Sequence, residues 1–289
     1  MKIGIAGIGR MGAAIAARLS SVGHEMMVWN RNADKARATG FKVAESPQAL
    51  AAGCEAVISI LTDARAVESV YGQLLSGNAS GKLFIEMSTV RPQDSRKISS
   101  LVTKKQAAFI ECPVGGTIGP AKEGKLFGFA GGEKADFERA KPLLDQMCRR
   151  VEYLGPAGSG ASMKLAINLP LLVYWQALGE ALSLTKHLNL DSARLMDILG
   201  DTSGAPRMLA NRGPAIAAAL TGKEGAVSVN IDTMKKDLTE MVEEARLLGW
   251  STPVTEGALR GFASASSAGL GDKDCVQLPV YWSGQPRKA

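Results

Sequence analysis

The stretch Lys2-Ile3-Gly4-Ile5-Ala6-Gly7-Ile8-Gly9-Arg10-Met11-Gly12 decides the fold, because a β-type run leads directly into a GxGxxG turn. Helix-forming residues follow to Ser21, so the turn joins a strand to a helix. One glycine makes the tight turn, the second lets the backbone approach a pyrophosphate, and the third permits close helix–strand packing. The phosphates would meet the N–H groups of the helix N-terminus. We therefore expect a dinucleotide site formed by Gly7, Ile8, Gly9, Arg10, Met11 and Gly12, with a ligand-free glycine turn as the alternative.

Outward from this turn, short β-rich runs alternate with helix-like segments through the first half of the chain. The predicted strands are 2–6, 25–29, 56–61, 82–87, 108–110 and 127–130, and the predicted helices are 11–21, 33–38, 93–104 and 134–147. Such alternation with short connections predicts an α/β fold class, with a Rossmann-type, doubly wound parallel sheet covered on both faces.

The character of the chain changes after the glycine-rich segment 155–160, beyond which helical periodicity predominates and no strand is predicted. We expect a cofactor-binding domain at 1–160 and an all-helical domain for substrate binding and oligomerisation at 161–289. The most apolar segment, 165–184, contains Asn168, Pro170, Gln176 and Glu180, which favours a core helix over a membrane span. Pro170 should kink or interrupt that helix, and the tail after Leu278 is expected to be loosely structured.

Composition excludes several kinds of protein. The net charge is +6, but basic and acidic residues are interleaved and aromatic residues make up only 5%, which argues against a nucleic-acid partner. The excess positive charge suits small anionic molecules instead. Four scattered cysteines and two histidines predict neither a disulfide framework nor a metal site. With no secretory signal visible, we expect a cytoplasmic protein without membrane or nucleic-acid partners.

The end of the second predicted strand bears on the choice of cofactor. An acidic residue there would bind the ribose 2′-hydroxyl of NAD, whereas this chain has Asn30, Arg31 and Asn32, with Lys35 one turn later. A guanidinium fork suits a 2′-phosphate, and Lys35 adds a second positive charge. The sequence therefore favours NADP(H) over NAD(H), with an ordinary solvated arginine as the alternative.

These motifs resemble the β-hydroxyacid dehydrogenase family, which includes 3-hydroxyisobutyrate dehydrogenases, tartronate semialdehyde reductases and glyoxylate/succinic semialdehyde reductases. The similarity begins with the glycine turn and covers nearly the whole chain. Leu61-Thr62 resembles the family's strand-end Leu-Pro that touches the cofactor, with Ala66 following at the family's spacing. Ser88-Thr89 resembles its Ser-Thr motif, which implies that Thr89 lies near the nicotinamide ribose.

The family's substrate loop, Pro-Val-Ser-Gly-Gly, resembles Pro113-Val114-Gly115-Gly116-Thr117. Here Gly115 stands in place of the serine and Thr117 in place of the second glycine. The resemblance implies that Gly115, Gly116 and Thr117 hold the substrate, since consecutive backbone N–H groups can cradle a carboxylate. A purely structural glycine turn is the alternative.

The family's catalytic lysine, with an asparagine four residues later, corresponds to Lys164 and Asn168. On a helix, this spacing puts both side chains on one face. Partial desolvation would lower the pKa of the lysine toward a range useful for proton transfer. Lys236, in Lys236-Asp237-Leu238, resembles a lysine that reaches the cofactor and substrate. The alternative for both lysines is a side chain that extends to solvent.

The resemblance implies an enzyme that transfers hydride between NADP(H) and a small 3-hydroxy acid or semialdehyde, without a metal. Two departures concern the pocket: Ile167 stands where many members have asparagine, and Val229 where an aromatic residue is usual. An imine reductase and a non-catalytic NADP(H)-binding protein remain as alternatives. The apolar second half predicts a homodimer or homotetramer.

Overall fold

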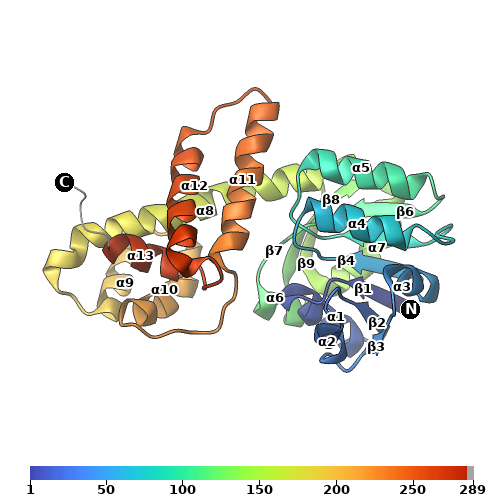
Figure 1. Ribbon diagram of the computed structural model, residues 1–289, viewed down its shortest axis with the longest axis horizontal. Coiled ribbons are helices and arrows are strands. Elements are labelled where there is room, and N and C mark those ends of the chain that lie inside the picture. The colour runs from blue at the N-terminus through green and yellow to red at the C-terminus, as the bar shows by residue number, and fades with distance from the viewer. Residues whose placement is uncertain (285–289) are drawn as a thin grey trace. The chain divides into compact units, whose positions relative to one another are not determined.

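The computed structural model describes residues 1–284 of this chain, which divides into two compact units, Met1–Leu165 and Ala166–Ala289. The first contains a nine-stranded sheet in the order β3-β2-β1-β4-β5-β6-β8-β7, with β9 paired to β8 (Figure 1). The strands are β1 (Lys2–Ala6), β2 (Glu25–Trp29), β3 (Lys42–Val43), β4 (Ala56–Ser59), β5 (Leu83–Glu86), β6 (Ala108–Glu111), β7 (Val114–Gly115), β8 (Leu126–Gly132) and β9 (Cys148–Tyr153).

Two hydrophobic clusters lie on opposite faces of this sheet, because alternate residues of each strand point in opposite directions. On β1, Ile3 and Ile5 belong to one cluster and Ala6 to the other; on β5, Ile85 and Phe84 divide in the same way. The first face is covered by α1 (Arg10–Ser21), α6 (Ile118–Glu123) and α7 (Lys134–Met147), and the second by α3 (Pro47–Gly53), α4 (Ala64–Leu74) and α5 (Pro92–Thr103). Helix α2 (Ala33–Arg37) leads into β3.

The predicted α/β fold class with a Rossmann-type sheet is confirmed, and the sheet departs from parallel pairing only at β8. Strands β1 to β6 are parallel, whereas β8 runs antiparallel to both β6 and β7. Strand β7 continues in the direction of β6, and the chain reverses between β7 and β8, over the segment that contains the short helix α6. The sequence patterns also missed the short strands β3 and β7, the charged edge strand β9, and helices α3, α4 and α6.

The second unit is helical, as expected. Helix α8 (Ser159–Thr185) leads into it, followed by η1 (Lys186–Leu188), α9 (Ser192–Gly200), α10 (Arg207–Leu220), α11 (Ile231–Leu247), α12 (Pro253–Ala265), η2 (Ser266–Leu270) and α13 (Gln277–Gly284). Helix α8 runs through Pro170 without interruption. The expectation of a loose tail is wrong for residues up to Gly284, which form α13; residues 285–289 lie outside the described part of the chain.

Helix α8 packs directly against two other helices of this unit. An added Cβ at Gly179 would lie 2.8 Å from Trp282 Cβ, and one at Gly261 of α12 would overlap the Gln176 side chain. By length and composition, Ser159–Leu188 could cross a membrane, and 39% of its most apolar window is buried within the chain. Its buried face includes Leu172, Trp175 and Leu178, which agrees with a core helix.

Candidate active site

The glycine turn after β1 has the close contacts that a dinucleotide-binding turn requires. Gly7 has a φ of 103°, and an added Cβ there would lie 2.1 Å from the Ile60 carbonyl oxygen. An added Cβ at Gly12 would lie 2.0 Å from the Gly7 carbonyl oxygen, whereas one at Gly9 would meet no atom within 4 Å. Two glycines are therefore required by packing, and the space beside Gly9 is open for a ligand.

The N-terminus of α1 also fits an anion. Its N-cap, Gly9, supplies no side-chain hydrogen bond, and its first turn contains no acidic residue. By contrast, Asn32, Ser46 and Asp63 cap helices α2, α3 and α4 through their side chains. The N–H groups at the start of α1 thus lack an internal acceptor from a capping side chain, and a pyrophosphate would satisfy them.

Most of the predicted cofactor residues follow the carboxyl ends of parallel strands. Gly7 follows β1, Asn30 follows β2, Leu61 follows β4 and Thr89 follows β5. Because β1 lies between β2 and β4, the chain connections diverge on either side of β1, which is the arrangement at which open α/β sheets bind their ligands. The fold therefore places these four loops along one edge of the sheet.

The loop after β2 is shaped by its two asparagines. Asn30 Oδ1 accepts a hydrogen bond from the Ile8 N–H at 2.9 Å, and Asn30 Nδ2 donates to the Asn32 carbonyl at 3.0 Å. Asn30 thereby joins this loop to the glycine turn. Arg31 and Lys35 are exposed, while the nearby Asp34 forms an ion pair with Arg37 at 2.7 Å. Two cations are available here for a phosphate, and the only acid of the segment is already paired.

The loops after β4 and β5 are joined to each other. The Leu61 N–H donates to Ser88 Oγ at 2.8 Å, which fixes Leu61 beside the segment containing Thr89. Thr62 Oγ1 donates to Asp63, and Asp63 caps α4 by accepting from the Ala66 N–H at 2.9 Å. Ala66 is therefore held by a helix cap, and Asp63 is a structural residue that the sequence patterns did not single out.

The predicted substrate loop contains one glycine that the structure requires. Gly115 lies in β7, and Gly116 has a φ of 123°, with an added Cβ only 2.9 Å from Leu126 Cδ2. Gly116 and Thr117 are exposed. Thr117 is the N-cap of α6, but its side chain makes no capping hydrogen bond, so its hydroxyl is not engaged as a cap.

Lys164 and Asn168 lie one turn apart on α8, and both are partly buried. The start of this helix is bonded to the carboxyl end of β6, where Glu111 Oε1 accepts from the N–H groups of Gly158 and Gly160 at 2.7 and 2.8 Å. Helix α8 therefore begins at the same edge of the sheet as the cofactor loops. This agrees with a role of Lys164 beside the nicotinamide.

In the helical unit, Asp237 links two predicted site residues. Asn168 Nδ2 lies 3.5 Å from Asp237 Oδ2, and Lys236 Nζ lies 2.7 Å from Asp237 Oδ1. Asp237 is 8% exposed. No role was assigned to it from the sequence, although an acid beside a lysine within an apolar helix face is a detectable signal.

Two further buried acids near the cofactor loops are not among the site residues predicted from the sequence. Glu86 and Glu111 are the last residues of β5 and β6, and both are 1% exposed. Burial raises the pKa of Glu86 to about 7, against the lowering effect of hydrogen bonds from Ser59 and Ser88. Burial likewise raises the pKa of Glu111, opposed by hydrogen bonds from Ser95 and from the backbone N–H groups of Gly158, Gly160 and Ala161.

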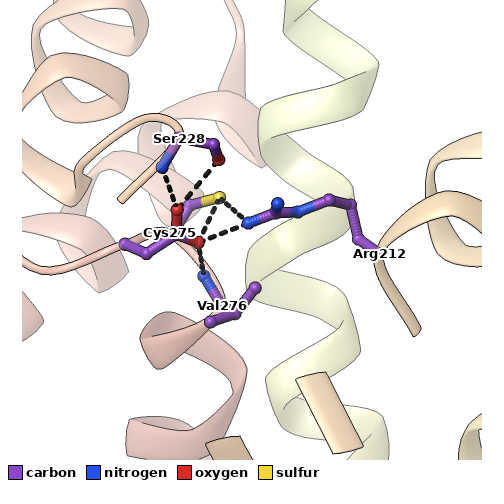
Figure 2. A network of polar contacts seen from close by, with 5 residues as sticks. Arg212, Ser228, Cys275 and Val276 are labelled. Carbon is purple, nitrogen blue, oxygen red and sulfur yellow. Dashed lines mark hydrogen bonds and ion pairs between the residues drawn. The ribbon is translucent and has the colours of Figure 1, made fainter. Parts of the chain in front are cut away.

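Another buried acid of the helical unit is separate from the predicted site. The Asp274 carboxylate accepts from the Arg212 side chain, from the Ser228 N–H at 2.6 Å and from the Val276 N–H at 3.0 Å. Figure 2 labels Arg212, Ser228, Cys275 and Val276 in this network. A neighbouring cavity of about 330 Å³ is lined by Arg212 and Asp274, but by none of the predicted site residues. Within residues 1–284, no cluster of His, Cys, Asp and Glu could hold a metal ion.

Comparison with known proteins identifies the class of both halves. The family described as the NAD binding domain of 6-phosphogluconate dehydrogenase matches residues 2–155. The family described as the NAD-binding part of NADP-dependent 3-hydroxyisobutyrate dehydrogenase matches residues 158–281. The fold and site thus define a nicotinamide-dependent oxidoreductase, and the predicted NADP cofactor class is confirmed.

Individual relatives identify the group of nicotinamide-dependent oxidoreductases to which the chain is similar. The chain is 34% identical to glyoxylate/succinic semialdehyde reductase 1 of Arabidopsis thaliana, over 95% of this chain and 96% of that protein. It is 32% identical to 3-hydroxyisobutyrate dehydrogenase of Pseudomonas aeruginosa, over 89% of each. The structure of 3-hydroxyisobutyrate dehydrogenase from Salmonella typhimurium is similar, with a TM-score of 0.86, 25% identity, and coverage of 96% of this chain and 99% of that one. The chain belongs to the β-hydroxyacid dehydrogenase family, and it is an oxidoreductase that transfers hydride between a nicotinamide and a small hydroxy acid.

Proposed function

We propose that this protein is an NADPH-dependent reductase of a small anionic semialdehyde or oxo acid, with Lys164 as the general acid. Bound NADPH would supply the hydride. Lys164, as an ammonium, donates a proton to the carbonyl oxygen of the substrate, and the neutral amine accepts it in the reverse direction. The observation that carries this role is the attachment of the start of α8 to Glu111, at the sheet edge where the cofactor loops lie.

Asn168 is the second member of the catalytic pair in this proposal. Its side-chain nitrogen faces Asp237 Oδ2 at 3.5 Å. In the proposed mechanism, the Asn168 amide positions Lys164 or the substrate oxygen by hydrogen bonding. Lys236 would reach the cofactor while its charge is balanced by Asp237. The proposed substrate site is completed by the backbone N–H groups of Gly115–Thr117, and the exposed Thr117 hydroxyl is a candidate for the position of the family's serine.

Replacement of Lys164 tests the catalytic assignment. Lys164→Ala should lower kcat at least about 100-fold, because general acid–base catalysis contributes on this order, while the Kd for NADPH changes little. Ser162→Ala, an exposed polar residue on the same helix, serves as the matched control and should retain activity. Full activity of Lys164→Ala would exclude Lys164 as the proton donor.

The preference for NADP(H) is proposed to come from Arg31 and Lys35, with Ile8, Arg10 and Met11 beside the pyrophosphate. Arg31→Ala should weaken NADPH binding about 10- to 100-fold and leave NADH binding nearly unchanged, since it removes a charge-assisted hydrogen bond to the 2′-phosphate. Arg37→Ala removes a cation of the same segment that is paired with Asp34, and it should affect neither cofactor. Equal losses for both cofactors in Arg31→Ala would contradict the assignment.

The substrate can be identified by NADPH oxidation with glyoxylate, succinic semialdehyde and a cyclic imine, compared at equal concentration. Turnover of the aldehydes supports the proposal, whereas activity with the imine alone would favour an imine reductase. Binding of NADPH without any turnover would favour a non-catalytic protein.

A homodimer or homotetramer is also proposed. Less than half of the most apolar window of α8 is buried within one chain, and Met163, Ile167 and Leu184 are exposed on it. A second subunit would remove this apolar surface from water. Light scattering coupled to gel filtration measures the assembly directly, and a monomer would refute it. We further propose a cytoplasmic location for this assembly, which fractionation of cells can test.

A further inference from the structure

Glu86 and Glu111 are buried acids at equivalent positions of neighbouring strands. They are paired in the parallel register of β5 and β6, so their side chains leave the sheet on the same face at the cofactor edge. Neither belongs to the proposed catalytic or substrate residues. Burying a carboxyl group costs considerable free energy unless its oxygens are hydrogen-bonded, so the partners of each acid indicate its role.

The partners of Glu86 lie in and beside the two loops that the family resemblance assigns to the cofactor, with Leu61 in a motif that touches it and Thr89 near the nicotinamide ribose. Glu86 Oε1 accepts from the Ser88 N–H at 2.7 Å, and Oε2 accepts from the Ser59 hydroxyl. Ser88 Oγ in turn accepts from the Leu61 N–H at 2.8 Å. Glu86 therefore holds Ser88 in the position from which it joins the loop after β5 to the loop after β4.

The partners of Glu111 lie at the start of the helix that carries Lys164. Glu111 Oε1 accepts from Gly158, Gly160 and Ala161 N–H groups, at 2.7, 2.8 and 3.3 Å. These are N-terminal N–H groups that the helix itself cannot satisfy. The carboxylate also lies at the positive end of the helix dipole, which favours a negative charge.

Strand β8 packs closely against the start of α8, where Glu111 is hydrogen-bonded to the helix. An added Cβ at Gly131 would lie 3.0 Å from the Gly160 nitrogen, and one at Gly160 would lie 2.1 Å from the Phe129 carbonyl oxygen. The start of α8 therefore rests directly on the backbone of β8 while Glu111 binds its N–H groups. Lys164 follows only three residues after Ala161, so its backbone position depends on this attachment.

We propose that Glu86 and Glu111 are positioning residues with separate tasks: Glu86 orders the two loops that bind the nicotinamide half of the cofactor, and Glu111 sets the position of Lys164. The division rests on the proposed function, in which Lys164 donates the proton, and on the cofactor role that the family resemblance implies for the two loops. Glu86 and Glu111 are paired between neighbouring strands, are equally buried and lie at the same edge of the sheet. The proposal nevertheless predicts a different defect for the loss of each. Each acid is therefore the matched control for the other.

Alanine and glutamine variants of both acids test the division. Glu86→Ala should raise the Kd for NADPH about tenfold, since it releases the bonds that order the Leu61 and Ser88 loops. Glu111→Ala should leave that Kd within about twofold and lower kcat about tenfold or more. The glutamine variants should restore most of each loss, because an amide oxygen accepts the same N–H bonds and an amide nitrogen can donate to the neighbouring hydroxyl.

Hydrogen exchange gives a readout that does not depend on turnover. Amides of residues 158–165 should exchange faster in Glu111→Ala than in the parent protein, and at the parent rate in Glu86→Ala. If Lys164→Ala proves fully active, the proposed function fails, whereas the NADPH affinity and amide exchange still decide the present proposal. If Glu86→Ala does not fold, Ser88→Ala is used in its place. If Glu111→Ala does not fold, Glu111→Asp is used in its place.

The two acids are expected to give different defects when they are replaced. The division is supported if Glu86→Ala loses NADPH affinity and Glu111→Ala loses kcat. Faster amide exchange at residues 158–165 should accompany only Glu111→Ala. Equal defects in both alanine variants would overturn it, because they would indicate a general loss of stability. Defects that glutamine does not relieve would also overturn it, since the hydrogen bonds would then not be their cause.

Discussion

Helices α1 and α8 both begin at the carboxyl edge of the parallel strands, but their N-terminal N–H groups have different acceptors. The N-cap of α1, Gly9, has no side chain, and an added Cβ there would meet nothing within 4 Å. The N–H groups at the start of α8 bind the buried Glu111 carboxylate. One helix end is left open for an anionic ligand, and the other is closed by an anion of the protein itself.

The two helix ends share one requirement, a close approach to the neighbouring backbone. Gly12 in α1 and Gly160 in α8 would each place an added Cβ about 2 Å from a carbonyl oxygen, of Gly7 and Phe129 respectively. Close packing is thus common to a binding helix and to an anchoring helix. The difference lies in the acceptor, so exchanging or removing acceptors tests the comparison.

The largest effect, on NADPH affinity, is expected when a side chain is introduced that accepts hydrogen bonds from the N-terminal N–H groups of α1. Gly9→Asp fits the open space, and aspartate is a good N-cap, so the protein should remain folded. Its carboxylate would occupy the proposed place of the pyrophosphate, and the like charges should weaken NADPH binding about 1,000-fold. Fluorescence titration with NADPH measures this, with Gly9→Ala as the uncharged control. Normal affinity in Gly9→Asp would show that the phosphates bind elsewhere.

A pH effect of about 3 kcal/mol is expected from Glu86, which lacks the helix N-terminus that Glu111 has. Its ordinary pKa of 4.5 rises to about 7 on folding. Between these values the folded state retains a proton that the unfolded state has lost, so stability falls as the pH rises from 4.5 to 7 and then levels off. Tyr71 and Glu111 are the titratable groups that interact with it.

Urea unfolding of the parent protein and Glu86→Gln between pH 4.5 and 8 isolates this contribution. Glutamine cannot titrate, so the parent should lose stability relative to the variant across this range. A difference between the two proteins that does not change with pH would contradict the assigned shift.

An intermediate effect is expected from added volume at the anchoring helix. Gly160→Ala should lower the free energy of unfolding by about 2 kcal/mol, because its Cβ would overlap the Phe129 carbonyl. The variant should lose kcat while its NADPH affinity stays near that of the parent. Ser162→Ala, an exposed position in the next residues of α8, is the control. A loss of NADPH affinity larger than the loss of kcat would show that the helix end serves the cofactor.

The smallest effect is expected at a helix end with an ordinary cap. Ser46 Oγ accepts from the Ala49 N–H at 3.1 Å at the start of α3, and Ser46 is not one of the predicted cofactor residues. Ser46→Ala should lower the free energy of unfolding by about 1 kcal/mol and leave NADPH binding unchanged. A changed affinity would mean that capping of α3 influences the glycine turn.

Local patterns were sufficient to predict much of the sheet. The runs around Ile3, Ile58 and Ile85 are apolar and bounded by turn residues, so their strands could be identified within a residue or two. The edge strand β9, Cys-Arg-Arg-Val-Glu-Tyr, was missed because its charged side chains are exposed and its pairing with β8 supplies the order. The reversal of β8 occurs between Gly115 and Leu126, over the segment that contains α6, and the sequence patterns did not predict that helix.

The sequence by itself determined the cofactor turn, since the roles of Gly7, Gly9 and Gly12 follow from adjacent residues and from the geometry of one strand and one helix. It also indicated Lys164 and Asn168, through their helical spacing and their family resemblance. Only the tertiary structure decided which acceptor each helix N-terminus would have. Glu111 meets Gly158 and Gly160 across 47 and 49 residues, and Glu86 meets Ser59 across 27. Such partners are chosen by packing of the sheet, and no local pattern encodes them.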